Sequence, residues 1–277
     1  SFTGHPVLFS STNPDSSTTA YTDGTSIASN VISFTVPHNA PDTLYYYCQN
    51  HPTSMNGSIS ITTDETKADP YAWKNVLALP LVGSSNDVSA SIACTQTNYS
   101  ITDNNNASAS NDTSNFYSGS FEFDGDADSL TFTTSSDLSL DGDFTIEFWI
   151  NLDTITVDTQ HPSPITMPTD GSAVSQVYIQ STNDYFGLYK SGNIVTTGNN
   201  SALTGVWQHV AFTRSGSTCY AFLDGVLKNT ATSTATFGGT TGTFRIGSFN
   251  GGGGDVDGYM QDLRIYKGVA KYTSDFV

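Results

Sequence analysis

The residues with the clearest chemical meaning are a cysteine, two histidines and a methionine near the N-terminus. Cys48, His51 and Met55 follow the apolar run at 44–48 with the spacing Cys-x2-His-x3-Met, and His5 lies far upstream of them. A thiolate, two imidazoles and a weak thioether form the ligand set of blue-copper centres, and one loop after a strand can deliver three of these groups. We therefore predict a copper site formed by His5, Cys48, His51 and Met55.

Two alternatives remain open for these residues. His38 could replace His5, but it lies in a turn shortly before Cys48, and the intervening strand would carry it to the opposite end of the sheet. The set could also be purely structural, with Cys48 as a small buried apolar residue, Met55 as a gap filler and His51 as a turn residue.

The elements that must position these ligands are strands. Glutamate occurs only at positions 65, 122 and 147, whereas Ser, Thr, Asn, Asp and Gly dominate, and this composition favours strands and turns over helices. Strand-like runs in the first part are at 7–9, 31–36, 44–48 and 58–62. Four strands cannot close a sandwich, so we predict an incomplete domain at 1–63 that depends on further strands or on a neighbouring chain.

A second strand pattern begins after a polar linker predicted at 64–74. Strand-like runs recur at 76–82, 119–123, 130–133, 144–151, 176–180, 185–189, 207–214, 219–223, 243–246 and 259–266. Alternation in the fourth run places Phe144 and its apolar partners on one face and Glu147 and Trp149 on the other. The spacing predicts an antiparallel two-sheet sandwich over 75–277, with a hairpin turn at Asp224-Gly225 and loops at 84–118 and 250–257.

Composition narrows the possible partners. The formal net charge of −17 would repel a polyanion, so we expect no binding to nucleic acid. No apolar run is long enough to span a bilayer, and no signal peptide is recognisable at Ser1. The three cysteines allow at most one disulfide and do not identify the compartment.

The second part resembles laminin-G-like domains of the concanavalin A-like group. The resemblance rests on Phe123-Asp-Gly-Asp-Ala-Asp-Ser-Leu, Gly142-Asp-Phe-Thr-Ile-Glu-Phe-Trp-Ile, Trp207-Gln-His-Val-Ala-Phe-Thr-Arg, Phe222-Leu-Asp-Gly and Gly258-Tyr-Met-Gln-Asp-Leu-Arg-Ile-Tyr. It implies a jelly-roll β-sandwich. Such domains are mostly carbohydrate- or protein-binding modules, often with structural calcium, and are common in tail-fibre and surface proteins of marine phages and in secreted bacterial proteins.

The first part is similar to plastocyanin-like cupredoxins. The copper motif, the long separation from His5, and Phe34-Thr-Val-Pro-His-Asn-Ala-Pro carry this resemblance. The fold class expected for the whole chain is therefore all-β. A partial cupredoxin-like Greek-key sandwich would precede the concanavalin A-like jelly roll.

The resemblance to laminin-G-like domains implies two further sets of site residues. Exposed aromatic rings that could stack on sugars are Trp149, Tyr185, Tyr189 and Trp207, although aromatic residues in a sandwich also fill the core. Carboxylates that could bind Ca²⁺ are Asp124, Asp126, Asp128 and Asp262, although Asp also caps turns.

The sequence predicts a protein that binds rather than catalyses. Retaining glycoside hydrolysis needs two closely spaced carboxylic acids, and Glu147 stands alone in its strand. We predict an adhesive structural protein, extracellular or on a virion surface, that binds a glycan or neighbouring subunits and forms a homo-oligomer or larger assembly. The alternative is a secreted copper protein for electron transfer that uses the jelly roll for targeting.

Overall fold

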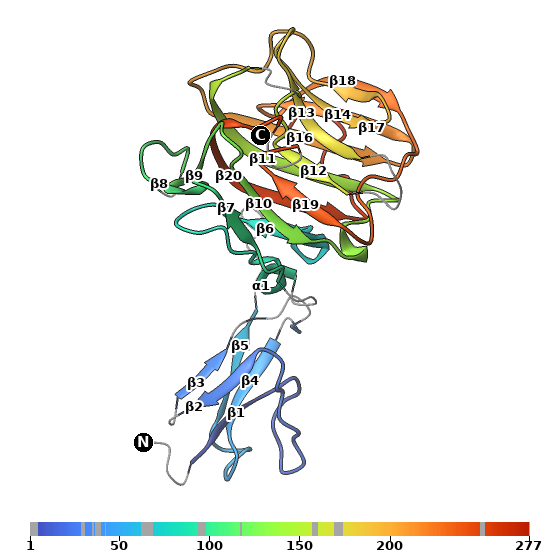
Figure 1. The fold of residues 1–277 in the computed structure, drawn as a ribbon. Helices are drawn as coiled ribbons and strands as arrows, with labels where there is room; N and C mark the ends of the chain where they lie inside the picture. The colour runs from blue at the N-terminus through green and yellow to red at the C-terminus, as the bar shows by residue number, and fades with distance from the viewer. Residues whose placement is uncertain are drawn as a thin grey trace. The chain divides into compact units, whose positions relative to one another are not determined.

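The regular secondary structure of the described residues consists almost entirely of antiparallel strands, which confirms the predicted all-β class. The structure is a computed structural model that describes residues 5–28, 31–34, 36, 40–41, 43–61, 69–93, 98–116, 118–156, 160–168, 174–249 and 253–276. The chain divides into two compact units, Ser1–Pro70 and Tyr71–Val277 (Figure 1). No helix in the described residues has the length and apolarity needed to cross a membrane.

The first unit contains a small sheet and a separate hairpin. Its strands are β1 (Val7–Ser10), β2 (Thr25–Ala28), β3 (Val31–Phe34), β4 (Thr43–Cys48) and β5 (Asn56–Ser60). Strand β4 lies between β1 and β5, and β2 pairs with β3. Strand β4 is hydrogen-bonded along both edges, and its residues Leu44, Tyr47 and Cys48 are buried.

The second unit is a sandwich of two large sheets. The seven-stranded sheet has the order β15 (Asn193–Thr196), β14 (Tyr185–Lys190), β13 (Ser175–Gln180), β12 (Ile165–Met167), β19 (Thr243–Ile246), β10 (Ser129–Thr133) and β7 (Thr102–Asn104). The eight-stranded sheet has the order β18 (Val226–Thr232), β17 (Thr218–Leu223), β16 (Gln208–Ser215), β11 (Phe144–Thr154), β20 (Asp257–Lys267), β9 (Ser120–Asp124) and β8 (Ser108–Ser110), with β6 (Asn75–Leu79) also paired to β20. Figure 1 labels most of these strands.

The core lies between the two sheets. The predicted alternation in β11 is confirmed, since Phe144, Ile146, Phe148 and Ile150 are at most 1% exposed and belong to one apolar cluster. The seven-stranded sheet contributes Val177 and other buried apolar side chains to the same cluster. Burying each such side chain stabilises the fold by roughly 1.5–3 kcal/mol, so side chains between the sheets fix the register and the remaining positions face outward.

Several expectations about loops and boundaries need correction. The tract at 84–118 was predicted as a loop, but it contains the short helix α1 (Ser89–Ala93) and strands β7 and β8. Short strands β2, β12 and β15 were also missed, because they are short and carry little periodic signal. In the predicted linker, 64–68 lie outside the described residues, and 72–74 form the 3-10 turn η1 (Ala72–Lys74).

The predicted hairpin at Asp224-Gly225 is confirmed. It joins β17 to β18, and both turn residues adopt positive φ, 51° at Asp224 and 76° at Gly225. Asp tolerates this region better than most residues and Gly adopts it freely, which explains why this dipeptide is a dependable turn signal.

Candidate functional site

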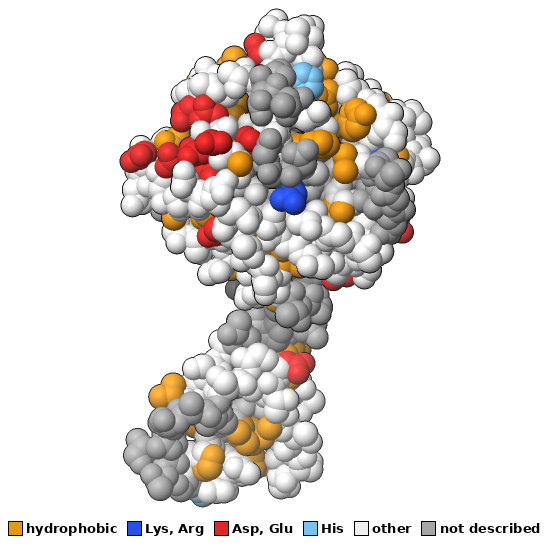
Figure 2. Space-filling model, viewed as in Figure 1, with side chains coloured by type: hydrophobic (Ala, Val, Ile, Leu, Met, Phe, Trp, Pro, Cys, Tyr) orange, Lys and Arg blue, Asp and Glu red, His pale blue; other side chains and the backbone are white. Residues whose placement is uncertain are grey.

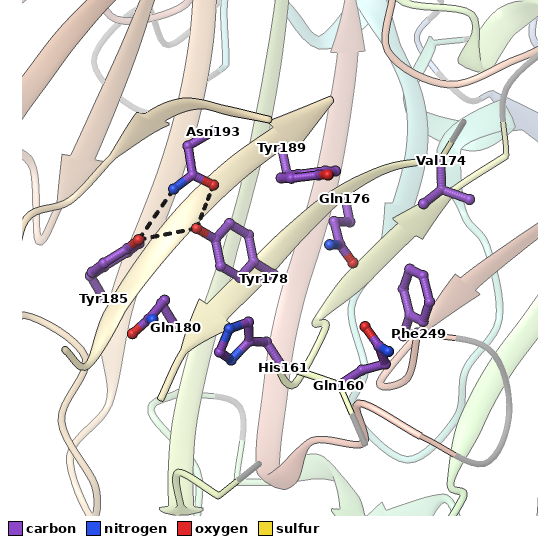
Figure 3. A pocket seen from close by; sticks show the side chains of 10 residues that line it. All are labelled: Gln160, His161, Val174, Gln176, Tyr178, Gln180, Tyr185, Tyr189, Asn193 and Phe249. Atoms are coloured by element: carbon purple, nitrogen blue, oxygen red, sulfur yellow. Dashed lines mark hydrogen bonds between the residues drawn. The ribbon is translucent and has the colours of Figure 1, made fainter. Parts of the chain in front are cut away.

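A cavity of about 410 Å³ opens on the outer face of the seven-stranded sheet (Figure 3). Strands β13, β14 and β15 supply most of its wall. Because Val177 and Ile179 point into the core, the alternate residues Gln176, Tyr178 and Gln180 point outward. The full lining is Gln160, His161, Val174, Gln176, Tyr178, Gln180, Tyr185, Tyr189, Asn193 and Phe249.

Three tyrosines form the aromatic part of this cavity. The ring of Tyr178 lies 6.1 Å from the rings of both Tyr185 and Tyr189, at 76° and 82° to them, and Figure 3 shows it between the other two. Its hydroxyl donates to Asn193 Oδ1 at 2.7 Å, and Asn193 Nδ2 donates to the Tyr185 hydroxyl at 3.3 Å. Burial raises the pKa of Tyr178 far above its usual range, so this phenol stays a neutral donor.

Carboxamides form the polar part. Gln180 Oε1 accepts hydrogen bonds from the backbone N–H groups of Thr182 and Asn183 at 2.8 and 2.7 Å, which fixes its amide group. Gln176 Oε1 is buried and has no hydrogen-bond partner among the described residues. The described lining includes no Lys, Arg, Asp or Glu, so the cavity offers ring faces and neutral hydrogen-bonding groups. Such a surface suits a ligand with both apolar faces and hydroxyl edges.

The four aromatic residues predicted to bind sugar do not form one site. Tyr185 and Tyr189 line the cavity, whereas Trp149 lies on β11 of the other sheet, 5.1 Å from the ring of His209. Trp207 donates through Nε1 to Thr113 Oγ1 at 3.2 Å and does not line the cavity. Sequence reasoning missed Tyr178, although the alternation through 175–180 placed it on the same face as Gln176.

Trp149 belongs to a second, more apolar cavity of about 520 Å³ on the eight-stranded sheet. Its lining is Trp149, His209, Asp224, Gly225, Tyr272 and Phe276. The rings of Tyr272 and Phe276 stack on one another at 3.5 Å, and Phe276 N–H donates to the Gly225 carbonyl at 2.8 Å. The C-terminal segment is therefore packed against β17 and β18.

Glu147 lies next to this second cavity as a buried anion with satisfied oxygens. Lys271 Nζ donates to Oε1 at 2.7 Å, and the Tyr272 hydroxyl donates to Oε2 at 2.8 Å. Burial alone would lower the pKa of Lys271, but the Glu147 carboxylate together with Tyr266 and Tyr272 raises that pKa overall. His209 Nε2 is 3.8 Å from Oε2, and burial lowers the pKa of His209 despite this carboxylate.

Three of the predicted copper ligands lie together in the first unit. Val7 pairs with Cys48 across β1 and β4, so the chain just before β1 reaches the same end of the sheet as the loop after β4. Cys48 Sγ is 3.5 Å from His5 Nδ1 and 3.6 Å from His51 Nδ1. Metal–sulfur and metal–nitrogen bonds of about 2.3 and 2.0–2.1 Å that meet near the tetrahedral angle separate these atoms by about 3.5 Å. Both sulfur–nitrogen distances therefore fit coordination to a single metal ion.

The fourth predicted ligand has a different environment. The Met55 carbonyl accepts a hydrogen bond from Cys48 N–H at 2.8 Å, which closes the ligand loop, but the Met55 side chain is 48% exposed. Its role as an axial ligand stays a prediction. His38, the alternative imidazole, lies outside the described residues.

The predicted calcium ligands divide into two places. Asp128 is buried in the turn between β9 and β10, where its carboxylate accepts from the backbone N–H groups of Asp124 and Asn106 at 2.9 and 2.7 Å. Asp124 Oδ1 accepts from the backbone N–H of Asp126 at 3.0 Å. Asp262 instead pairs with Arg264 at 2.8 Å. These contacts stabilise the turn and the strand, and calcium binding stays a prediction.

The fold and the sequence together define the class of this chain. The sequence profile of the concanavalin A-like lectin/glucanases superfamily matches residues 124–271, more than half of the chain. The chain belongs to this superfamily, and the resemblance read from its motifs is confirmed for the second unit. No curated protein sequence matches the chain.

Solved structures with a similar fold are distant in sequence. Domain 4 of AbnA, a GH43 extracellular arabinanase from Geobacillus stearothermophilus in complex with arabinotriose, has a TM-score of 0.54 at 17% identity, covering 70% of this chain and 93% of that one. The binding domain of Paraclostridial Mosquitocidal Protein 1 has a TM-score of 0.51 at 12% identity, covering 72% and 50%. The binding domain of botulinum neurotoxin serotype D has a TM-score of 0.50 at 12% identity, covering 76% of this chain and 50% of that one. The chain thus spans about half the length of the two toxin structures.

Proposed function

We propose that the second unit is a non-enzymatic glycan-binding module and that the cavity over β13, β14 and β15 is its binding site. The observation that carries this proposal is the combination of three tyrosine rings and several carboxamides, with no Lys, Arg, Asp or Glu in the described lining. Pyranose and furanose rings have apolar faces that stack on aromatic rings, and hydroxyl edges that exchange hydrogen bonds with amides. Domain 4 of AbnA, which shares the fold, was solved with arabinotriose, and this supports a sugar ligand.

The unpartnered oxygen of Gln176 adds a reason for the ligand to carry hydroxyl groups. A buried acceptor without a donor costs about 1–3 kcal/mol. Gln176 lies beside Tyr189 in Figure 3, and rotation about its soft terminal torsion would turn the oxygen toward the cavity. A sugar hydroxyl at that position would remove the cost and so contribute to affinity.

The same lining supports binding without hydrolysis. Glycoside hydrolysis by the usual routes uses two carboxylic acids on either side of the scissile bond. None of the described residues of the cavity is an acid, and Glu147 is held by Lys271 and Tyr272 on the other sheet. We expect the protein to bind an oligosaccharide without releasing new reducing ends.

We extend the proposal to an adhesive protein of an extracellular or virion surface. An acidic, all-β chain with a sugar-binding face suits attachment to glycan-coated surfaces. In the first unit, β1 and β5 are the outer strands of their sheet, and among the described strands each pairs only with β4. Open strand edges can pair with a neighbouring subunit through backbone hydrogen bonds, which supports assembly into an oligomer.

A glycan array probed with the full chain tests the proposed site. We expect binding to at least one class of oligosaccharide and a loss of about tenfold or more in Tyr189→Ala, because this variant removes a stacking surface. Tyr220→Ala is the matched control, since Tyr220 lies on β17 of the other sheet and should leave binding unchanged. Equal binding by both variants, or no binding to any glycan by the wild-type protein, would contradict the proposal.

A second proposed function is copper binding by the first unit. Its support is the convergence of one thiol and two imidazole nitrogens within 4.8 Å of one another. A soft thiolate with two imidazoles favours copper, and bound copper would supply one-electron chemistry. His5 and His51 are exposed, so an ion can reach them from solvent, whereas Cys48 is buried.

A further inference from the structure

Arg245 lies on the same sheet face as the proposed glycan site. In β19, Phe244 and Ile246 belong to the core, so Arg245 points to the outer face of the seven-stranded sheet. Its side chain is half-buried, and no hydrogen bond or ion pair joins it to another described residue. Arg214 and Arg264, in contrast, are engaged by backbone carbonyls and by Asp262. Arg245 is thus a cation with no partner among the described residues.

The register of the sheet connects Arg245 to the cavity in one straight row. Successive strands pair Tyr189 with Gln176, Gln176 with Thr166, Thr166 with Arg245, and Arg245 with Thr131. All five side chains face outward, because their neighbours along each strand point into the core. Neighbouring strands lie about 4.8 Å apart, so three strand spacings of roughly 14 Å separate Tyr189 from Arg245. That distance exceeds one sugar ring and suits an oligosaccharide lying across the strands.

Thr166 lies in the row between the cavity and Arg245. It is only 4% exposed, and its hydroxyl donates to the Ser248 carbonyl at 3.1 Å. Thr166 is therefore covered by its neighbours and offers no free group to a ligand, so a spanning ligand would be held by Tyr189 and Gln176 at one end and by Arg245 at the other.

We propose that Arg245 extends the glycan site into an acidic-sugar subsite, so that the ligand is an oligosaccharide with a carboxylate about three strand spacings from the ring stacked on Tyr189. This inference rests on the proposed glycan-binding function and specifies its ligand class. The guanidinium group presents parallel N–H donors that match a carboxylate, and such charge-assisted contacts are among the stronger hydrogen bonds.

The large negative charge of the protein does not cancel this local attraction. At physiological ionic strength, charges separated by more than about 8 Å are largely screened, whereas a direct contact is screened much less. Figure 2 shows acidic side chains of the second unit gathered toward one side of the visible face, and the blue of Lys and Arg lies apart from them. Once a ligand is bound, the direct contact with Arg245 therefore decides whether an acidic or a neutral oligosaccharide is preferred.

The test compares the binding of two forms of one ligand to the whole 277-residue chain. The probes are a hexuronate-containing oligosaccharide and its carboxyl-reduced counterpart, which has the same sugar rings without the charge. We expect the wild-type protein to bind the acidic form on the order of tenfold more tightly in titration calorimetry. Arg245→Gln should abolish this preference while leaving affinity for the reduced form unchanged, and Arg245→Lys should retain part of it.

Two further variants make the outcome decisive. Lys228→Gln removes the same charge from exposed β18 on the other sheet and should keep the preference. Tyr189→Ala should lower the affinity for both the acidic and the carboxyl-reduced oligosaccharide. If both forms bind equally and Tyr189→Ala weakens both, the acidic subsite is wrong while glycan binding stands. If Lys228→Gln loses the preference for the acidic form as Arg245→Gln does, the preference comes from the net charge of the protein and the subsite at Arg245 is wrong. If neither form binds, the inference fails together with the proposed function for this ligand class.

Discussion

Replacing Glu147 with alanine is expected to lower the free energy of unfolding by about 3–5 kcal/mol. The carboxylate is only 7% exposed and accepts hydrogen bonds from Lys271 and Tyr272, and Lys271 itself is only 11% exposed. Without Glu147, the ammonium group of Lys271 would remain buried with its main counter-charge removed. Removing one member of a buried ion pair costs more than the pair contributes, because the other charge is left uncompensated.

Denaturant unfolding of a small set of variants measures this effect. Lys271→Ala should also destabilise the protein, and the Glu147→Ala/Lys271→Ala double variant should lose less than the sum of the single variants, since neither charge is then left alone. A loss below about 1 kcal/mol in Glu147→Ala would show that solvent reaches the pair and screens it. Glycan affinity should be unaffected in any variant that folds, because Glu147 lies on the other sheet.

Adding Cu²⁺ to the protein is expected to produce an intense thiolate-to-copper absorption band with about one equivalent of bound metal. Cys48→Ser should abolish the band completely, because the hydroxyl is not a soft ligand and cannot give this transition. His5→Ala and His51→Ala should each shift or weaken it, since both nitrogens lie within 3.6 Å of the sulfur. The measurement is a visible spectrum combined with metal analysis of the dialysed protein.

A matched cysteine variant serves as the control for the copper experiment. Cys219 is fully buried in the second unit, and burial raises the pKa of its thiol, so Cys219→Ala should leave the band unchanged. Stoichiometric zinc without any visible band from copper would mean that the three residues hold a different metal. No bound metal at all would leave Cys48 and the two histidines as structural residues and remove the second proposed function.

The sandwich could be predicted from sequence because its main signals are local. In β11, alternation of apolar and polar residues follows directly from the strand period of two, and the structure buries Phe144 and Phe148 as expected. Asp224-Gly225 is equally local, since its positive φ angles need no distant contact. The strand β7 had no such signal: Thr102 to Asn104 are all polar, and they form a strand only because β10 offers them hydrogen bonds.

The site was only partly predictable, because sequence does not say which sheet an exposed aromatic residue occupies. Tyr189 and Trp149 both sit at outward positions of strands, but the two strands belong to opposite sheets. Arg245 could not be linked to Gln176 either, since their relation depends on the strand order β13-β12-β19. The same limit applied to Glu147, whose partners Lys271 and Tyr272 come from the far end of the chain.

Amide chemical shifts of the full chain, followed by NMR during titration with the oligosaccharide that binds best on the array, test the central claim most directly. We predict that the largest shift changes fall on β13, β14 and β15, around Tyr178, Tyr185 and Asn193, and that Tyr189→Ala strongly reduces them. Changes concentrated instead around Trp149 and His209 would place the ligand in the other cavity and contradict the proposed site.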